Sequence, residues 1–469
     1  MLKALKVVSG GLLLAFLGCG VEGDVDEPLT ETRSALEAAG NDYGVAESFH
    51  TTGAIDFTNP MFLQLGTNPR SCATCHAPDQ GWTMTADANK ELFKESDGLA
   101  PLFNLVDEGN RPDGDISTKD ARRATFGPQT IKLALTRFTR NISTTAAGAA
   151  QYTITAVEDP SGFPVTTSSF LNFRRPTQMA NETKVSSILN TSGPTQDIPV
   201  TLAGLFNGAA GLHEQRDVVN NPVPVEQRNA GRDFALGLFN AQIIDKDAGR
   251  LDAAGALGGP ANLSTFPFTL GMNDVLSPTF DRRVFTLFDA WAVYADDKNC
   301  HGNKRDEARG AIYRGQEVFN TNQFVISGVN GFNTAFQTVA GVGEPFVGTC
   351  SSCHNTPNVG GHSVIRMVDI GTANEPNCNP VLPIITVQNK TTMETRRVCD
   401  LGRGQGSGVW TELASFRVPP LRGLAARAPY FHNGSAKNIK QAIRYHEDRF
   451  NINLSHGKRK DLEAFLGAL

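Results

Sequence analysis

The chain has 469 residues, of which 40% are hydrophobic and 19% are charged, the composition of an ordinary globular protein. This composition excludes a disordered chain and a multi-span membrane protein, and the length favours two or three domains. The formal net charge of −5 provides no basic surface of the kind that binds nucleic acid, so we expect no nucleic-acid partner.

Residues 1–19 are typical of an export signal. Two lysines precede the apolar stretch 12–17, and a small residue then stands before Cys19. That ending resembles the bacterial lipoprotein processing site, which predicts a lipidated Cys19 that tethers the protein to a membrane; a plain signal peptide cut nearby is the alternative. Residues 20–45 are acidic, then small and polar, which predicts a tether. We expect a periplasmic protein or a lipoprotein anchored at the outer membrane.

The pattern C-x-x-C-H occurs twice, at positions 278 residues apart. The copies are Cys72-Ala73-Thr74-Cys75-His76 and Cys350-Ser351-Ser352-Cys353-His354. Two thiols at this spacing can add to the vinyl groups of one haem, and the adjacent histidine then becomes the proximal ligand of the iron. A thioredoxin-like redox pair and half of a zinc site are the alternatives, but a redox pair does not need the histidine. The sequence therefore predicts two covalently bound haem c groups.

The first haem site stands near the beginning of a long segment, 46–300, which we expect to be the N-terminal haem domain. The stretch 151–157 alternates apolar and polar residues, which predicts a short strand or a hairpin. Helices are expected at 228–240 and 284–295. This half is predicted to be a cytochrome c-like domain that is enlarged by loops and a short β element.

The second haem site has the layout of a small cytochrome c domain, 303–469. Amphipathic helices are predicted before the site, at 306–320, and after it, at 460–469. Glycine and proline are dense between 402 and 429, which predicts loop structure. We therefore expect a mainly α fold with two cytochrome c-like domains, one for each haem.

Three of the eight cysteines belong neither to the haem motifs nor to the export signal. Cys378 and Cys399 are 21 residues apart and could close a disulfide bond outside the cytoplasm. Cys300 would then be free. A bond between Cys300 and one of the other two is the alternative.

A series of short motifs connects these sites to a known family. They are Thr356–Ser363 (TPNVGGHS), Asp400–Arg403 (DLGR), Phe416–Leu424 (FRVPPLRGL), Ala428–Gly434 (APYFHNG), Asp448–Ile452 (DRFNI), Asp159–Pro164 (DPSGFP) and Phe173–Pro176 (FRRP). Together they resemble the bacterial di-haem cytochrome c peroxidase and MauG-like family, in a subgroup with an enlarged N-terminal domain. The resemblance covers most of the mature chain and is most specific over 350–469.

The resemblance implies a division of labour between the haems. The C-terminal haem would receive and store electrons, and the N-terminal haem would bind hydrogen peroxide and split its O–O bond. The electron donor would be a small cytochrome c or a cupredoxin. Members of the family often form homodimers, so the resemblance implies one here too.

The resemblance also implies a ligand for the second haem. In the family, a methionine or tyrosine stands fourteen residues after the histidine of the Pro-Tyr-Phe-His motif, and the same offset from His432 leads to His446. His446 is therefore expected as the sixth ligand opposite the proximal His354, and His432 is expected near a haem propionate. The alternatives to His446 are Met367, Met393 and Tyr445. His362 is expected to form hydrogen bonds rather than to bind iron.

The first haem, with His76 as its proximal ligand, has no obvious ligand on its distal side. No histidine occurs between His76 and His213, and an open iron position is what a reactive haem needs. The alternative is that His50 folds back and binds the iron as its distal ligand.

Several features of the family are replaced in this chain. The family carries a distal glutamate and glutamine for proton transfer, but the matching stretch 202–205 has no acid, which leaves Glu182 and Glu214 as weak candidates. The tryptophan that lies between the haems in the family is matched by the stretch 190–193 (NTSG). The residues account for only part of the calcium site found in the family. The backbone carbonyls of Arg427 and Pro429 could bind one calcium ion, but Arg175 stands where the family has an asparagine.

Three functions are consistent with these observations. The leading one is a peroxidase that reduces hydrogen peroxide with electrons from a small redox protein. The second is oxidation of an organic or protein substrate on the same scaffold, which the missing distal acid mildly favours. The third is a non-catalytic electron-transfer cytochrome in which both irons have six ligands.

Overall fold

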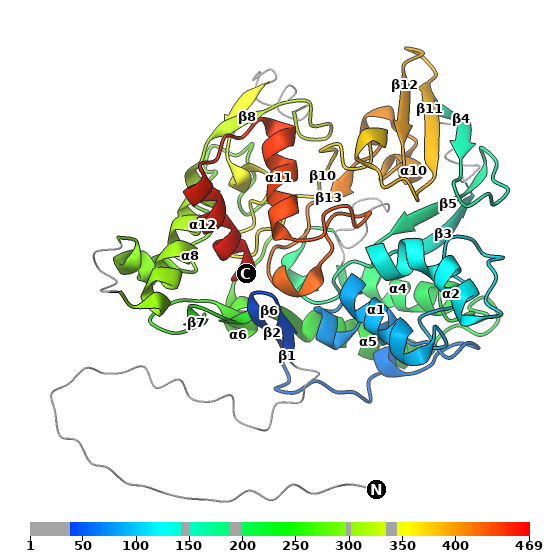
Figure 1. The fold of residues 1–469 in the computed structure, drawn as a ribbon, viewed down its shortest axis with the longest axis horizontal. Coiled ribbons are helices and arrows are strands. Elements are labelled where there is room, and N and C mark those ends of the chain that lie inside the picture. Colours follow the sequence, from blue (N-terminus) through cyan, green and yellow to red (C-terminus); the bar gives the residue numbers. More distant parts are fainter. Residues whose placement is uncertain (1–37, 142–149, 188–197, 297–301, 334–344) are drawn as a thin grey trace, which may run out of the picture.

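The computed structural model describes residues 38–141, 150–187, 198–296, 302–333 and 345–469 (Figure 1). The expected export signal with Cys19, the first part of the tether, the stretch 190–193 and Cys300 lie outside the described residues. No helix within the described ranges is long and apolar enough to cross a membrane.

The longer elements are helices in both halves of the chain. The α-helices are α1 (Ala86–Ser96), α2 (Lys119–Phe126), α4 (Ile198–Leu212), α5 (Val225–Gly237), α6 (Gly259–Thr265), α8 (Lys304–Thr321), α10 (Gly404–Ser407), α11 (Ile439–Phe450) and α12 (His456–Gly467). Short 3₁₀ helices include η2 (Cys72–Thr74), η5 (Glu182–Lys184), η6 (Asp289–Tyr294), η7 (Cys350–Ser352) and η10 (Ala425–Arg427).

Small antiparallel sheets connect these helices. The strands are β1 (Ala38–Asn41), β2 (Gly44–His50), β3 (Thr136–Asn141), β4 (Tyr152–Glu158), β5 (Ser169–Arg174), β6 (Leu238–Asp245), β7 (Gly249–Arg250), β8 (Phe324–Ile326), β9 (Phe346–Gly348), β10 (Met367–Val368), β11 (Ile384–Asn389), β12 (Thr395–Val398) and β13 (Phe416–Arg417). Five sheets occur in the described part of the chain, in the orders β1-β2-β6-β7, β10-β13, β12-β11-β4, β3-β5 and β8-β9. This is more β structure than the single short element that the sequence predicts.

The two helices expected around the second C-x-x-C-H motif are confirmed as α8 and α12. Each helix begins at a side chain that caps it. The side chain of Asn303 accepts a hydrogen bond from the backbone N–H of Arg305, and the side chain of Ser455 accepts one from the backbone N–H of Lys458. The helices pack closely at Gly315, where a Cβ atom would lie 1.9 Å from the carbonyl oxygen of Asp461. Glycine is therefore required at this crossing.

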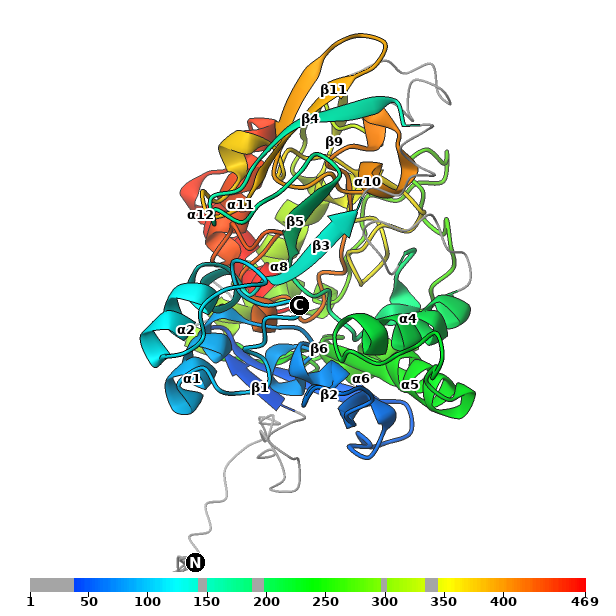
Figure 2. The same cartoon turned by 90° about the vertical axis from the view of Figure 1, so that its right-hand side faces the viewer.

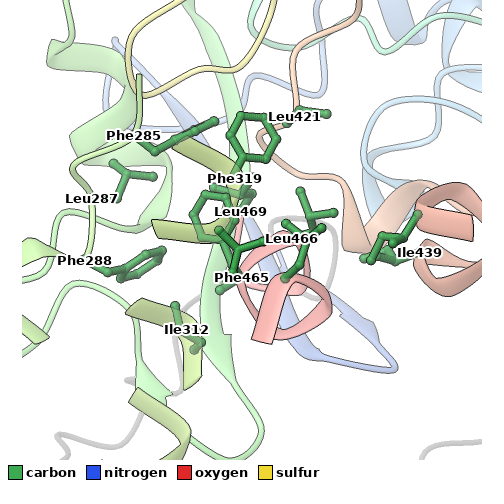
Figure 3. Close-up of a cluster of buried hydrophobic side chains, with 14 of the residues drawn as sticks. Phe285, Leu287, Phe288, Ile312, Phe319, Leu421, Ile439, Phe465, Leu466 and Leu469 are labelled. Carbon is green, nitrogen blue, oxygen red and sulfur yellow. The ribbon is translucent and has the colours of Figure 1, made fainter. Parts of the chain in front are cut away.

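The largest apolar core surrounds this pair of helices (Figure 3). Phe465 of α12 is fully buried, and its ring meets those of Phe285 and Phe319 at centroid distances of 5.2 and 5.8 Å. Residues before and after the second motif thus share one core, which fixes the position of the motif itself.

Two helix predictions in the first half need correction. The expected helix 228–240 ends at Gly237, because residues 238–240 instead begin β6 and pair with β2. The expected helix 284–295 is reduced to the 3₁₀ helix η6. Its first residues cannot join a helix because side chains of α8 bind their backbone: Asn320 binds both the N–H and the carbonyl of Phe285, at 3.1 and 2.7 Å.

The expected tether is also shorter than residues 20–45. From residue 38 onward the chain forms β1 and β2, and β2 pairs along its length with β6. Backbone hydrogen bonds of a sheet therefore hold the last eight residues of that stretch.

The strand expected at 151–157 is confirmed as β4, but it does not form a local hairpin. It pairs with β11 from the second half of the chain, in the sheet β12-β11-β4 (Figure 2). The disulfide bond between Cys378 and Cys399 is confirmed beside this sheet. A buried ion pair between Arg174 and Asp400, at 2.6 Å, also joins the two halves. The division into domains 46–300 and 303–469 stays a prediction.

We predict that Phe465→Ala lowers the free energy of unfolding by about 3–5 kcal/mol, because it removes a fully buried aromatic ring from the core between α8 and α12. Denaturant unfolding of the purified protein, followed by circular dichroism, measures this change. Leu99→Ala is the matched control: its side chain is 73% exposed, so the expected change is within about 0.5 kcal/mol. Equal midpoints for the two variants would contradict the assignment of this core.

Candidate functional site

The first C-x-x-C-H motif forms a single tight turn. Cys72 begins η2, and its carbonyl accepts a hydrogen bond from the backbone N–H of His76 at 3.0 Å. The His76 Nδ1 atom lies 3.2 Å from the carbonyl oxygen of Trp82. Because a carbonyl can only accept, Nδ1 carries the proton and Nε2 keeps the lone pair that a metal requires.

The second motif repeats this geometry. The backbone N–H of His354 donates to the carbonyl of Cys350 at 3.1 Å, and His354 Nδ1 donates to the carbonyl of Gly360 at 2.5 Å. Burial lowers the pKa of His76 and of His354 to about 4, so both imidazoles are neutral at physiological pH. A neutral imidazole with Nδ1 protonated is the form that binds iron through Nε2.

The thiols of the two motifs differ from those of a redox pair. Burial raises the pKa of Cys72, Cys350 and Cys353 to about 12, whereas a reactive thioredoxin-like cysteine requires a lowered pKa. Within the ranges that the structure describes, no three or more His, Cys, Asp or Glu side chains are grouped so that they could hold a metal ion. A structural zinc site is built from four such ligands.

A cavity of about 310 Å³ lies over the second motif. His354 and His446 both line it, together with the motif's two cysteines. Its apolar walls include Phe319, Phe324, Val368, Ile370, Leu421, Phe431, Ile443, Phe450 and Leu462. An apolar cavity with two imidazoles and a pair of cysteines fits a haem that is attached at one edge.

The ring of His446 is oriented by its own helix. It stands on α11, where its Nδ1 atom donates to the carbonyl of Ala442 at 2.8 Å, so that Nε2 keeps its lone pair. Burial is the main cause of the low pKa of His354, and the nearby His446 lowers it further.

The other candidate ligands are placed less well. The hydroxyl of Tyr445 donates to the carbonyl of Ile370 at 2.9 Å, and Met393 is 61% exposed. Met367 lies in β10, where its neighbour Val368 faces the cavity. Side chains of adjacent strand residues point to opposite faces, so Met367 is turned away.

Buried positive charge collects at the edge of this cavity. Arg175, Arg417 and Arg427 line it, and burial lowers the pKa of Arg175 to about 9 and that of Arg427 to about 10. Arg175 donates to the carbonyl of Met84 at 2.5 Å, but its Nε atom has no hydrogen-bond partner. Buried cations are costly unless an anion neutralises them, so this edge fits the carboxylates of haem propionates. Two neighbouring guanidinium groups also disfavour a calcium ion here.

His432 lies at the same edge. Its ring is stacked on Phe416 at a centroid distance of 3.9 Å, and its Nε2 atom is buried without a hydrogen-bond partner. A propionate would supply the missing acceptor. His362 is instead held by the carbonyl of Cys353, 2.6 Å from its Nδ1 atom.

The structure separates the two acidic candidates. Glu214 lies at the first motif, where it accepts from the backbone N–H of Leu65 at 2.6 Å and lies 3.8 Å from the Cys72 sulfur. Glu182 instead lies near Arg417, a residue that lines the cavity over the second motif, and burial raises the pKa of Glu182 to about 7. The carboxylate of Glu214 is thus bound by the chain, and Glu182 lies near a residue of the other site.

His50, the alternative ligand of the first haem, is occupied elsewhere. Its Nδ1 atom lies 2.7 Å from the hydroxyl of Thr52, and its Nε2 atom lies 3.2 Å from the carbonyl of Phe234. Both ring nitrogens therefore have partners within the protein.

A polar cluster that the sequence did not reveal lies beside the first motif. His213 binds the carboxylate of Asp107 through Nδ1, and Arg70 binds the same carboxylate. Glu108 is fully buried next to them, and burial raises its pKa well above the usual value. These residues come from three distant segments and follow no common spacing, so no signal in the sequence could have joined them.

Comparison with known proteins gives one partial match. The chain is 32% identical over 94 residues to cytochrome c551 peroxidase of Pseudomonas aeruginosa, a stretch that covers 20% of this chain and 22% of that protein. No family model matches the chain, and no solved structure matches it. The similarity supports a distant relationship to a di-haem peroxidase and a peroxidase-like, haem-dependent function at a coarse level.

Proposed function

We propose that this protein is a di-haem c-type oxidoreductase that reduces hydrogen peroxide at the haem of Cys72, Cys75 and His76. Electrons would arrive from a small cytochrome c or cupredoxin through the haem of Cys350, Cys353 and His354. The partial similarity to a cytochrome c551 peroxidase supports this proposal. The observation that carries it is the apolar cavity in which His354 and His446 lie together, with buried arginines at its edge.

The proposal assigns different tasks to the two sites. When bound, haem supplies the electron transfer and the oxygen chemistry that no side chain provides. At the second site, His446 opposite His354 would complete the iron's coordination and make that haem an electron store. The arginines and His432 would hold its propionates. The expected mainly α fold with two cytochrome c-like domains, the export of the protein and its dimerisation remain part of this proposal.

A non-catalytic electron carrier is the second candidate function. The observation that favours it is the position of His213 near His76, because a second imidazole could close the first iron as well. Oxidation of an organic or protein substrate is mildly favoured by the absence of an acid from the stretch 202–205.

We expect one high-spin and one low-spin signal in the electron paramagnetic resonance spectrum of the ferric protein. The purified protein should then turn over hydrogen peroxide with a reduced small cytochrome as donor, consuming two electrons and two protons for each peroxide and releasing two waters. Donor oxidation followed by absorbance measures this rate. Two low-spin haems and no turnover would leave the electron carrier as the function.

We expect the two motifs to bind haem independently. A Cys350→Ser/Cys353→Ser variant should lose the mass of one haem in intact-protein mass spectrometry, because both thioether bonds at that site are removed. The Cys72→Ser/Cys75→Ser variant should lose the other. Cys378→Ser/Cys399→Ser is the matched control, since it removes the disulfide and should keep both haems. Retention of both haem masses in either motif variant would refute covalent attachment at that site.

We predict that His446→Met raises the midpoint potential of one haem and leaves the other unchanged, because methionine stabilises ferrous iron relative to imidazole. The expected rise is on the order of 0.1 V, a fraction of the ~0.8 V range that axial ligands control. Spectroelectrochemical titration measures it. His362→Met is the control at a histidine that binds a backbone carbonyl. An unchanged titration of His446→Met would place the ligand elsewhere.

A further inference from the structure

The polar cluster beside the first C-x-x-C-H motif holds its side chains in fixed positions. Asp107 binds the Nδ1 atom of His213 on one side and the guanidinium of Arg70 on the other. Arg70 also donates to the carbonyls of Pro101 and Leu102, at 3.0 and 2.7 Å. The carboxylate therefore stands in a fixed position and determines how the imidazole is oriented.

Asp107 also selects the tautomer of His213. An ionised carboxylate only accepts hydrogen bonds, so Nδ1 carries the proton and Nε2 is left with a lone pair. Nε2 is therefore the ring nitrogen that can accept a hydrogen bond or a proton from a bound ligand, in the orientation that Asp107 fixes.

The cluster lies within electrostatic reach of the haem motif. The charge of His213 contributes to the low pKa of His76, and Arg70, Asp107 and Glu108 all act on the thiol of Cys75. At the second motif, His446 has the same effect on His354, and those two histidines line one cavity. Glu214, which directly follows His213, lies 3.8 Å from the Cys72 sulfur, so a direct contact also brings this end of α4 to the first motif.

The backbone holds this arrangement. The side chain of Asn68, four residues before Cys72, donates to the carbonyl of His213 at 2.8 Å. The backbone N–H of Thr67 donates to the carbonyl of Glu214 at 2.8 Å. A Cβ atom at Gly66 would lie 1.9 Å from that same carbonyl oxygen, so glycine permits this close approach. The end of α4 is therefore fastened to the segment that leads into the motif.

A second acid completes the cluster. Glu108 is fully buried, and its Oε2 atom accepts from the hydroxyl of Thr130 at 2.9 Å. Its Oε1 atom has no hydrogen-bond partner and lies 3.9 Å from a nitrogen of Arg70. An unpartnered, buried carboxyl oxygen is costly in a purely structural cluster, which indicates that the site serves a ligand.

We infer that His213, oriented by Asp107, is the proton-transfer group on the distal side of the first haem. The inference rests on the proposed function, because it supplies the group that moves a proton during peroxide cleavage. The side chain of His213 is 32% exposed, so it can also exchange protons with solvent.

The proton balance of the step is simple. Bound haem would supply the iron and the electrons. His213 Nε2 would take a proton from one oxygen of H₂O₂ and give it to the other oxygen, which would leave as water when the O–O bond breaks. Two electrons from the reduced donor and two protons from solvent complete the conversion to a second water. Asp107 stays ionised and stabilises the imidazolium while His213 holds the proton.

Cyanide binding to the ferric haem protein tests this inference without turnover. Cyanide is present mainly as HCN at neutral pH and must lose its proton to bind iron, so a distal base accelerates the reaction. His213→Ala should slow cyanide binding by about 100-fold or more, the lower range for general acid–base catalysis, and leave the high-spin signal in place. Asp107→Asn should slow it by about 10-fold, because the imidazole loses its orienting charge. His456→Ala, at an exposed histidine, is the matched control and should bind cyanide at the wild-type rate.

Other outcomes would overturn the inference. If His213 were an iron ligand, His213→Ala would convert a low-spin haem to a high-spin one and cyanide would bind faster. A rate within twofold of wild type would mean that His213 takes no part. The proposed function has its own test. If cyanide binding changes as expected but the protein does not turn over peroxide, only the peroxidase function is refuted. If the protein turns over peroxide but His213→Ala does not change the rate of cyanide binding, only this inference is refuted.

Discussion

Burial of cationic side chains beside an apolar cavity is the constraint on which the second site depends. Arg427 is buried and Arg175 is half-buried, and their guanidinium groups bind backbone carbonyls rather than carboxylates. Such charges destabilise a fold unless an anion is buried with them. A haem bound here would meet both requirements at once, because its ring would fill the apolar space and its propionates would neutralise the cations. The stability of this half would then depend on binding of the cofactor.

The two sites repeat one local geometry in different surroundings. In each, a 3₁₀ turn carries the cysteines and a backbone carbonyl fixes Nδ1 of the histidine. The two sites differ in the partner of the other nearby histidine. The carbonyl of Ala442 in α11 holds Nδ1 of His446, whereas the carboxylate of Asp107 holds Nδ1 of His213. Both partners select the tautomer with Nδ1 protonated, but only the carboxylate places a negative charge beside the ring. In the proposed function, this difference would suit His446 to holding an electron-storing haem and His213 to proton transfer.

Local signals predicted well what depends on neighbours in the sequence. Amphipathic spacing predicted α8 and α12, and two cysteines 21 residues apart predicted the observed disulfide bond. The predictions were wrong or incomplete where contacts with distant segments determine the local structure. The backbone of Phe285 binds Asn320 instead of forming a helix, and β4 pairs with β11 from the other half. The cluster of Arg70, Asp107 and His213 was missed for the same reason, since its members are brought together only by the fold.

One segment connects the two sites physically. Residues 175–178 line the cavity over the second motif, and the next residue, Met179, donates its backbone N–H to the carbonyl of Trp82 at 3.0 Å. Trp82 strengthens this connection, because its carbonyl accepts from both His76 Nδ1 and the N–H of Met179. In the proposed function, this contact would lie between the two haem sites. It is made by residues that the structure describes, whereas the stretch 190–193, where the family resemblance places a tryptophan, lies outside the described residues.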